Sequence, residues 1–170
     1  MKPSKKLLDL SCRRIIGVDP GLASSGWGVI DCDRQRLIYI AHGCIKTAPE
    51  QSRPERLFSI YRTFCAVLDD YGPGESAIET LYFARNVSSA LAVAEARGVL
   101  SMALAERGLP VREFTPLAIK QAVVGGGRAD KGQIQEMVRI LLGLTTIPTP
   151  DHAADALGAA VCCAHSALLD

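Results

Sequence analysis

The sequence of 170 residues lacks any apolar run close to the roughly 20 residues that span a bilayer. Its first twelve residues, MKPSKKLLDLSC, carry lysines but only a broken apolar patch, which is not typical of a secretory signal peptide. The net charge is only +1, and this excludes a generally basic nucleic-acid coat. The sequence therefore predicts no membrane partner, and any contact with nucleic acid has to come from locally clustered Lys and Arg.

The sequence also lacks the spacing of a zinc site. None of the six cysteines forms a C-x-x-C pair, and none is spaced from the three histidines like a zinc ligand. Scattered cysteines of this kind are typical of small core residues in a reduced compartment. We therefore predict a cytoplasmic location.

The length and composition fit one folded domain. Apolar residues make up 48% of the chain and charged residues 22%, as in soluble globular proteins. A domain near this size removes roughly 70% of its unfolded surface from water, so a real core is expected. We predict a flexible N-terminal arm over residues 1–12 and a single domain over residues 13–170.

Residues 15–30, IIGVDPGLASSGWGVI, organise the rest of the chain. A buried strand leads to a carboxylate, Asp19, and a Pro-Gly turn then leads into a second strand. In that strand Gly26 and Gly28 alternate with larger residues, which predicts that its backbone is approached closely on one face. Taken alone, Asp19 fits equally well as a simple turn residue, because Asp-Pro-Gly is an ordinary turn sequence.

Apolar periodicity and turn residues predict five strands and five helices. Three consecutive strands with short connections form an antiparallel meander, and the alternating elements that follow add parallel strands. We predict an α/β fold with one mixed five-stranded sheet and helices on both faces. The strands are expected at about residues 15–19, 25–30, 37–46, 76–80 and 109–114, and the helices at about 54–71, 86–107, 116–124, 130–142 and 151–168.

Helix starts can be predicted from their capping residues. Asp130 and Gln133 match a capping box, in which the two side chains satisfy free N–H groups reciprocally. Thr149 and Pro150 are expected at the N-cap and first positions of the last helix. Asn86 is expected to cap the longest helix, whose many Ala, Ser and Gly residues allow close packing on another helix or on a partner subunit.

Acidic residues from distant parts of the sequence are expected to meet. Asp19 and Glu79 each end a central strand, and the last helix begins with Asp151, His152 and Asp155. On a helix, residues three or four apart share a face. Carboxylates that converge without matching cations repel unless they protonate or bind a hard cation, and oxygen-rich sites suit Mg²⁺ or Mn²⁺.

Four segments follow one another across about residues 14 to 165: DPGLASSGWGVID, AIETLYFARNVSSALAVAEARGVL, KQAVVGGGRADKGQIQEMVRILLGL and DHAADALGAA. In this order they resemble the RuvC family of bacterial Holliday-junction resolvases. The resemblance implies a ribonuclease H-like fold, a homodimer, and an endonuclease that acts on four-way DNA junctions and leaves 5′-phosphates. It also implies a partnership with the RuvAB branch-migration motor.

The resemblance places the family's catalytic and metal-binding positions on Asp19, Glu79, His152 and Asp155, around two Mg²⁺ or Mn²⁺ ions. His152 departs from the family, because many members have Asp there. Either His152 binds metal through nitrogen or Asp151 takes its place through a local change of register. We favour His152, because Asp151 is rotated by roughly 100° around the helix and already has a role as a negative charge in the first turn.

The same resemblance assigns DNA contacts. Lys120 and Lys131 match lysines near the scissile phosphate, Arg128 adds charge to the glycine loop between them, and Tyr82 matches an aromatic that stacks on bases. Arg85 is expected to contact a phosphate. The alternative for the basic residues is that they are ordinary solvated side chains at helix ends, and Tyr82 could instead lie at the rim of the core.

Three other functions are consistent with parts of the sequence. A ribonuclease H-like nuclease acting on RNA–DNA hybrids would share the acidic site. An actin-like or sugar-kinase-like phosphotransferase also begins with a D-x-G turn, but it needs a second lobe that 170 residues cannot supply. A catalytically silent junction-binding protein would have no use for converging carboxylates next to a phosphate.

Overall fold

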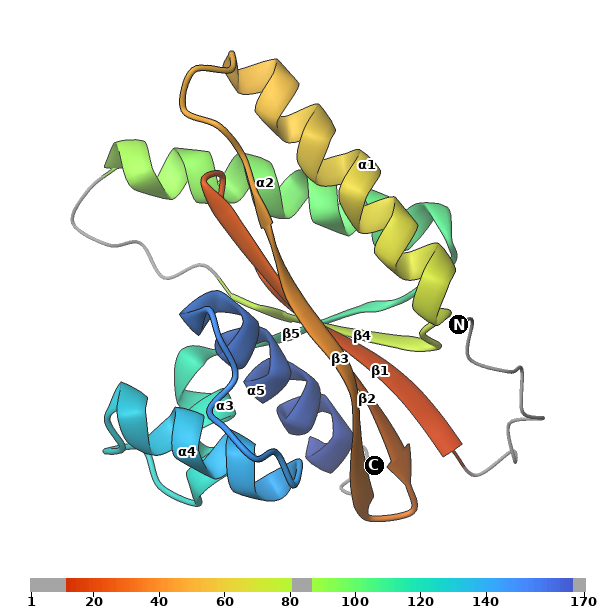
Figure 1. Ribbon diagram of the computed structural model, residues 1–170, viewed down its shortest axis with the longest axis vertical. Coiled ribbons are helices and arrows are strands. Elements are labelled where there is room, and N and C mark those ends of the chain that lie inside the picture. The colour runs from red at the N-terminus through yellow and green to blue at the C-terminus, as the bar shows by residue number, and fades with distance from the viewer. Residues whose placement is uncertain (1–11, 81–86, 167–170) are drawn as a thin grey trace.

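The computed structural model describes residues 12–80 and 87–166. Within these ranges one mixed sheet has the strand order β3-β2-β1-β4-β5, with β1, β2 and β3 antiparallel and with β4 and β5 parallel to β1 (Figure 1). The predicted α/β class and five-stranded mixed sheet are confirmed. The strands are β1 (Cys12–Asp19), β2 (Ser24–Asp33), β3 (Arg36–Lys46), β4 (Glu75–Glu79) and β5 (Val111–Phe114).

Helices cover both faces of this sheet. In Figure 1, α1 and α2 lie over one face, and α3, α4 and α5 lie over the other. In the described part of the chain, no helix is both long enough and apolar enough to cross a bilayer. The helices are α1 (Arg53–Tyr71), α2 (Val87–Glu106), α3 (Pro116–Val124), α4 (Lys131–Leu141) and α5 (Asp151–Ser166).

Each face of the sheet has its own apolar core, because successive side chains of a strand point to opposite faces. On β1, Ile15 packs with the residues of α5 and Ile16 packs with those of α1 and α2. Both side chains are fully buried, and so is Phe64 of α1. Burial of each such side chain stabilises the fold by about 1.5–3 kcal/mol, so β1 is held from both sides.

Glycines let α5 lie almost against the backbone of β1 and β2. A Cβ at Gly26 would stand 1.9 Å from the carbonyl oxygen of His152, and one at Gly17 would stand 1.9 Å from that of Ala156. At Gly28 a Cβ would meet the side chain of Leu157 at 2.6 Å. The predicted close approach to the glycine face of β2 is confirmed, and it fixes the start of α5 beside the end of β1.

Three predicted boundaries differ from the structure, two of them for identifiable reasons. β5 begins at Val111 rather than at residue 109, because the N–H of Leu109 bonds to Leu104 at the end of α2 and Pro110 has no N–H to donate. Pro150 lies at the N-cap of α5 and not at its first position, since its carbonyl accepts the N–H of Ala154. β1 also includes Cys12, which had been placed in the arm.

The sequence also predicted the N-terminal caps of α4 and α2. The capping box of α4 is confirmed, because Asp130 accepts the N–H of Gln133 at 2.9 Å and the Gln133 side chain accepts the N–H of Asp130 at 3.0 Å. Asn86, the expected cap of α2, lies outside the described residues.

Candidate active site

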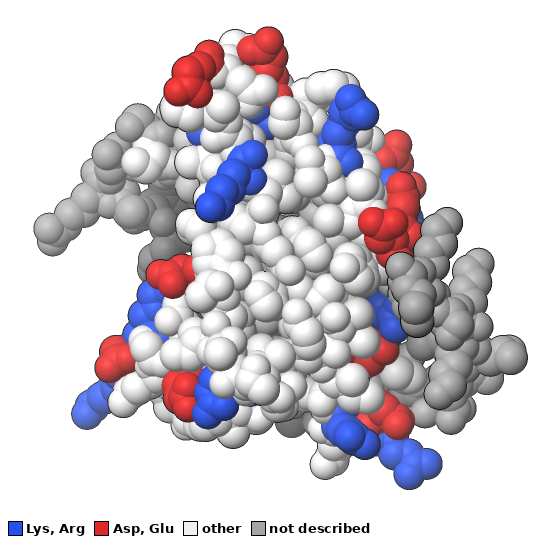
Figure 2. Space-filling view, in the orientation of Figure 1, with Lys and Arg blue, Asp and Glu red and all other residues white. Residues whose placement is uncertain are grey.

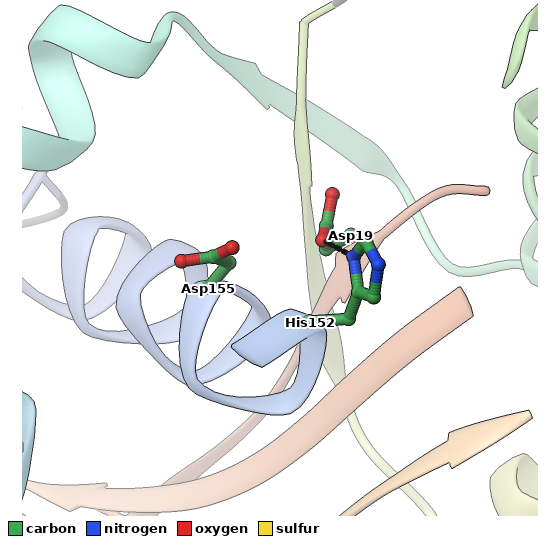
Figure 3. A group of neighbouring side chains, drawn as sticks. All are labelled: Asp19, His152 and Asp155. Atoms are coloured by element: carbon green, nitrogen blue, oxygen red, sulfur yellow. Dashed lines mark hydrogen bonds and ion pairs between the residues drawn. The ribbon is translucent and has the colours of Figure 1, made fainter. Parts of the chain in front are cut away.

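Three of the predicted site residues meet where β1 ends and α5 begins (Figure 3). Asp19 is the last residue of β1, and His152 and Asp155 lie on the first turns of α5. One ligand atom from each residue lies within 4.8 Å of the others. The imidazole of His152 faces Asp19, with 2.6 Å between Nδ1 and Oδ2. This arrangement can hold a cation between two carboxylates and an imidazole.

The carboxylate of Asp19 is largely removed from water, with 16% of its side chain exposed. Burial raises its pKa above the ordinary value, while the hydrogen bond from His152 acts in the opposite direction. The nearby carboxylate of Asp155 raises the pKa further. Asp19 is therefore a buried acid in a site with an excess of negative charge.

Glu79 completes the acidic site from the neighbouring strand. β1 and β4 pair in parallel, with Val18 opposite Ile78, so Asp19 and Glu79 follow at adjacent strand ends. Burial, and next the charges of Asp19 and Asp155, raise the pKa of Glu79 to about 7. Glu79 lies beside the three grouped residues and not within their 4.8 Å cluster.

A cleft of about 220 Å³ opens next to Glu79 between α3, α4 and α5. Glu79 and Asp155 line it together with Lys120 and Lys131. The Nζ atom of Lys131 lies 3.2 Å from Asp155 Oδ2 and 3.1 Å from an oxygen of Asp151. The two predicted lysines are therefore placed at the acidic site, on the side of the sheet that α3, α4 and α5 cover.

Asp151 lies apart from the cluster. Its carboxylate binds Lys131 and also accepts a hydrogen bond from Gln135 of α4 at 3.1 Å, and 65% of the side chain is exposed. The hydrogen bond from Lys131 is the main reason that the pKa of Asp151 is lowered. With this register, His152 and not Asp151 faces Asp19.

The remaining predicted DNA contacts are placed differently. Arg128 lines a separate open cavity of about 860 Å³ along α4, together with Asp130 and Met137. Tyr82 and Arg85 lie outside the described residues.

A second cleft lies beside the cluster, and the sequence did not predict it. It has a volume of about 450 Å³ and runs from His152 between the β1–β2 turn and the first turns of α1 and α2. Arg53 and Arg56 of α1 line it. No local signal marks these arginines in the sequence, because they approach His152 only when α1 packs over the sheet.

The donor set fits a divalent cation of the Mg²⁺ or Mn²⁺ type. Its oxygens are hard ligands and the imidazole adds nitrogen. Burial raises the pKa of Glu79 most, and the charges of Asp19 and Asp155 raise it further, so a cation bound here would offset that repulsion between carboxylates. A ribonuclease H-like sheet with acidic residues at the ends of two adjacent central strands and on a packed helix defines a class of metal-dependent nucleases.

Comparison with known proteins also indicates a nuclease. Residues 15–163 match the family model of the crossover junction endodeoxyribonuclease RuvC. The RuvC of Chloroflexus aurantiacus is 49% identical over 154 residues, which cover 91% of this chain and 94% of that protein. The RuvC of Treponema denticola is 49% identical over 147 residues, 86% of this chain and 83% of that protein.

A solved structure agrees in three dimensions. Thermus thermophilus RuvC, solved in complex with a Holliday junction substrate, superposes with a TM-score of 0.88 at 34% identity over 92% of this chain and 96% of that chain. The chain belongs to the RuvC family, and it is a nuclease that acts on DNA.

Proposed function

We propose that the protein resolves four-way DNA junctions in recombination and repair by paired, symmetrical hydrolysis of two phosphodiesters. The observation that carries this proposal is the cluster of Asp19, His152 and Asp155, with Glu79 at the adjacent strand end. A cluster of acids beside two lysines is suited to holding cations and a phosphate together.

Asp19, Glu79, His152 and Asp155 would hold two Mg²⁺ or Mn²⁺ ions. When bound, such ions neutralise charge on the phosphate, favour deprotonation of water and stabilise the leaving oxygen. Asp19 contacts His152 and ends the strand next to that of Glu79, so it would be the ligand common to both ion sites, and Glu79 and Asp155 would complete the two ligand sets.

His152 either binds metal or accepts the proton of the attacking water. In the tautomer that donates from Nδ1 to Asp19, Nε2 is the free nitrogen, and 45% of the side chain is exposed. Asp19 would then orient the ring. Water attacks phosphorus, the bond from phosphorus to the 3′ oxygen breaks, and the products are a 5′-phosphate and a 3′-hydroxyl without a covalent enzyme intermediate.

Basic residues around the site would position the DNA backbone. Lys120 and Lys131 share the cleft of Glu79 and Asp155, which supports contacts to phosphates at or next to the cleaved bond. We extend the proposal to Arg128 and Arg85 as backbone contacts and to Tyr82 as a stacking residue, as the resemblance implies.

Paired cleavage requires two equivalent sites, which a two-fold dimer supplies with matching symmetry. The α2 helix supports this proposal, because it exposes 57% of Leu91 and 55% of Met102. These residues are eleven apart and so lie on one face of the helix. We also propose a partnership with RuvAB and a cytoplasmic location.

The test compares substrates and metals. Wild-type protein is incubated with a synthetic mobile four-way junction, a matched linear duplex and an RNA–DNA hybrid, with Mg²⁺ or Mn²⁺ in turn. We expect paired nicks confined to the junction, and we expect Asp19→Asn to abolish them while junction binding persists. Cleavage of the hybrid instead would move the protein to the ribonuclease H-like alternative, and binding without cleavage in either metal would make it a silent junction-binding protein.

A further inference from the structure

The cleft on the His152 side contains residues to which the proposed function gives no role. Its walls come from the β1–β2 turn and from α1 and α2, so it opens at the sheet face opposite to the lysine cleft. Small residues line much of it, which allows a chain to approach closely. The small lining residues are Gly21, Ala23, Ser24, Ser89 and Ala92.

Arg56 is the unusual group in this cleft. Its side chain donates from Nε to the hydroxyl of Thr47 at 2.8 Å. Across residues 12–80 and 87–166, its two terminal nitrogens have no hydrogen-bond partner and no carboxylate pairs with it. By contrast, the partly buried Arg13 and Arg14 each bind a carboxylate through two nitrogens.

Arg53, the other arginine of the cleft, is less available to bind an anion. Its Nη1 lies 3.4 Å from a carboxylate oxygen of Glu95 on α2, which offsets its charge. Arg56 therefore supplies the uncompensated positive charge next to His152. A planar guanidinium with both terminal nitrogens free matches the oxygens of a phosphate.

The two clefts together define a path across the acidic site. Lys120 and Lys131 lie on one side with Glu79 and Asp155, and Arg56 lies on the other side with His152. We infer that Arg56 is a positioning residue that binds a non-scissile phosphate of the DNA strand, so that the strand is held on both sides of the cleaved bond. This inference rests on the proposed function.

The competing role for Arg56 is purely structural. Thr47 donates its hydroxyl to the carbonyl of Leu22 at 2.6 Å and accepts from Arg56, so the three residues link α1 to the β1–β2 turn. Thr47→Val breaks this link and leaves the charge of Arg56 in place. It is therefore the matched control for substitutions that remove the charge.

The experiment measures binding of a labelled immobile four-way junction in EDTA over a series of NaCl concentrations. For Arg56→Gln we expect roughly tenfold weaker binding, and a slope of log affinity against log salt that is shallower by about 0.9 for each protomer whose Arg56 touches DNA. Arg56→Met, which keeps the apolar stem, repeats the loss of charge in case Gln disturbs folding. Arg56→Lys should keep the slope and lose part of the affinity, and Thr47→Val should keep the wild-type slope.

Equal slopes for wild type, Arg56→Gln and Arg56→Met would overturn the inference, and so would an equal change in Thr47→Val. Cleavage of the junction by the wild type is measured alongside with Mg²⁺ or Mn²⁺. If wild-type cleavage is intact while the Arg56 slopes are unchanged, only the inference fails. If the wild type neither binds nor cleaves the junction, the proposed function itself fails.

Discussion

At the scale of single residues, the register of the first turn of α5 decides which side chain completes the site. His152 points at Asp19, and one residue earlier Asp151 points to α4, where Lys131 and Gln135 hold it. Adjacent positions on a helix differ by roughly 100°, so both cannot face the cluster at once. The imidazole of His152, and not the carboxylate of Asp151, therefore faces Asp19.

The first prediction concerns this pair. His152→Asp replaces nitrogen by oxygen in the ligand set and should shift the ratio of cleavage rates toward Mg²⁺ by about tenfold, because nitrogen ligands favour softer metals than Mg²⁺. Asp151→Asn should leave that ratio unchanged. Single-turnover cleavage of a four-way junction in each metal measures both ratios. The reverse pattern, in which only Asp151→Asn changes the ratio, would assign the ligand to Asp151.

A second residue-scale prediction concerns the ion pair at the other end of β1. Arg13 binds Glu75 through two nitrogens, with 2.7 Å between Nη2 and Oε2, and this hydrogen bonding is the main reason that the pKa of Glu75 is lowered. A lowered pKa gives stability that is present above the unfolded value and is lost as the pH falls through the folded value. Glu75→Gln should therefore reduce the free energy of unfolding at pH 7 by about 1 kcal/mol.

The difference between wild type and Glu75→Gln should shrink as the pH falls from the usual pKa of glutamate toward the lowered pKa of Glu75, because the unfolded chain then takes up a proton that the folded chain does not. Urea denaturation at pH 7 and at pH 3.5 measures it. A difference that is the same at both pH values would show that the loss comes from packing and not from the charge of Glu75.

At the scale of elements, the contact of α5 with β1 and β2 places the acidic site. We predict that Gly26→Ala displaces the start of α5, because its Cβ would overlap the carbonyl of His152. Overpacking of this kind should cost about 3 kcal/mol and should remove junction cleavage. Thermal unfolding and the cleavage assay measure the two effects.

Gly74→Ala is the control for this prediction. A Cβ at Gly74 meets nothing closer than 4.0 Å, so this variant should unfold and cleave like the wild type. Gly26→Ala with wild-type stability and activity would mean that α5 does not depend on the close approach.

The elements also show what a sequence can and cannot predict here. The periodicity of apolar residues and the glycines of β2 were enough for the sheet, the helices and the close approach of α5, because these depend on local patterns. The start of β5 was predicted two residues too early, because the N–H of Leu109 closes the end of α2 by bonding to the carbonyl of Leu104 and so does not join the sheet. The sequence alone also could not predict that Arg56 lines the cleft of His152, because this depends on how α1 packs over the sheet.

At the scale of the whole molecule, the distribution of charge limits how DNA can bind. Figure 2 shows Lys and Arg interspersed with Asp and Glu around the rim of the face in view, with a broad uncharged area in its middle. This agrees with a net charge of +1. With so small a net charge we expect few phosphate contacts, so the loss of any one of them should measurably reduce the salt dependence of DNA binding.

The last prediction concerns whether the active enzyme is a dimer with two active sites. If two protomers pair through α2, then Leu91→Asp with Met102→Asp should give a monomer, because both exposed side chains lie on the face that the partner would cover. Light scattering after size-exclusion chromatography measures the mass. The exposed Phe58 of α1, replaced by Asp, is the matched control and should leave the mass unchanged.

The same double variant separates paired from single cleavage. On a junction in a supercoiled plasmid, two coordinated nicks give a linear product and one nick gives an open circle. The monomer should therefore shift the product from linear to open circular while Asp19, His152 and Asp155 stay intact on each chain. Linear product from a protein shown to be monomeric would contradict the need for a dimer, and an unchanged mass would place the interface elsewhere than on this face of α2.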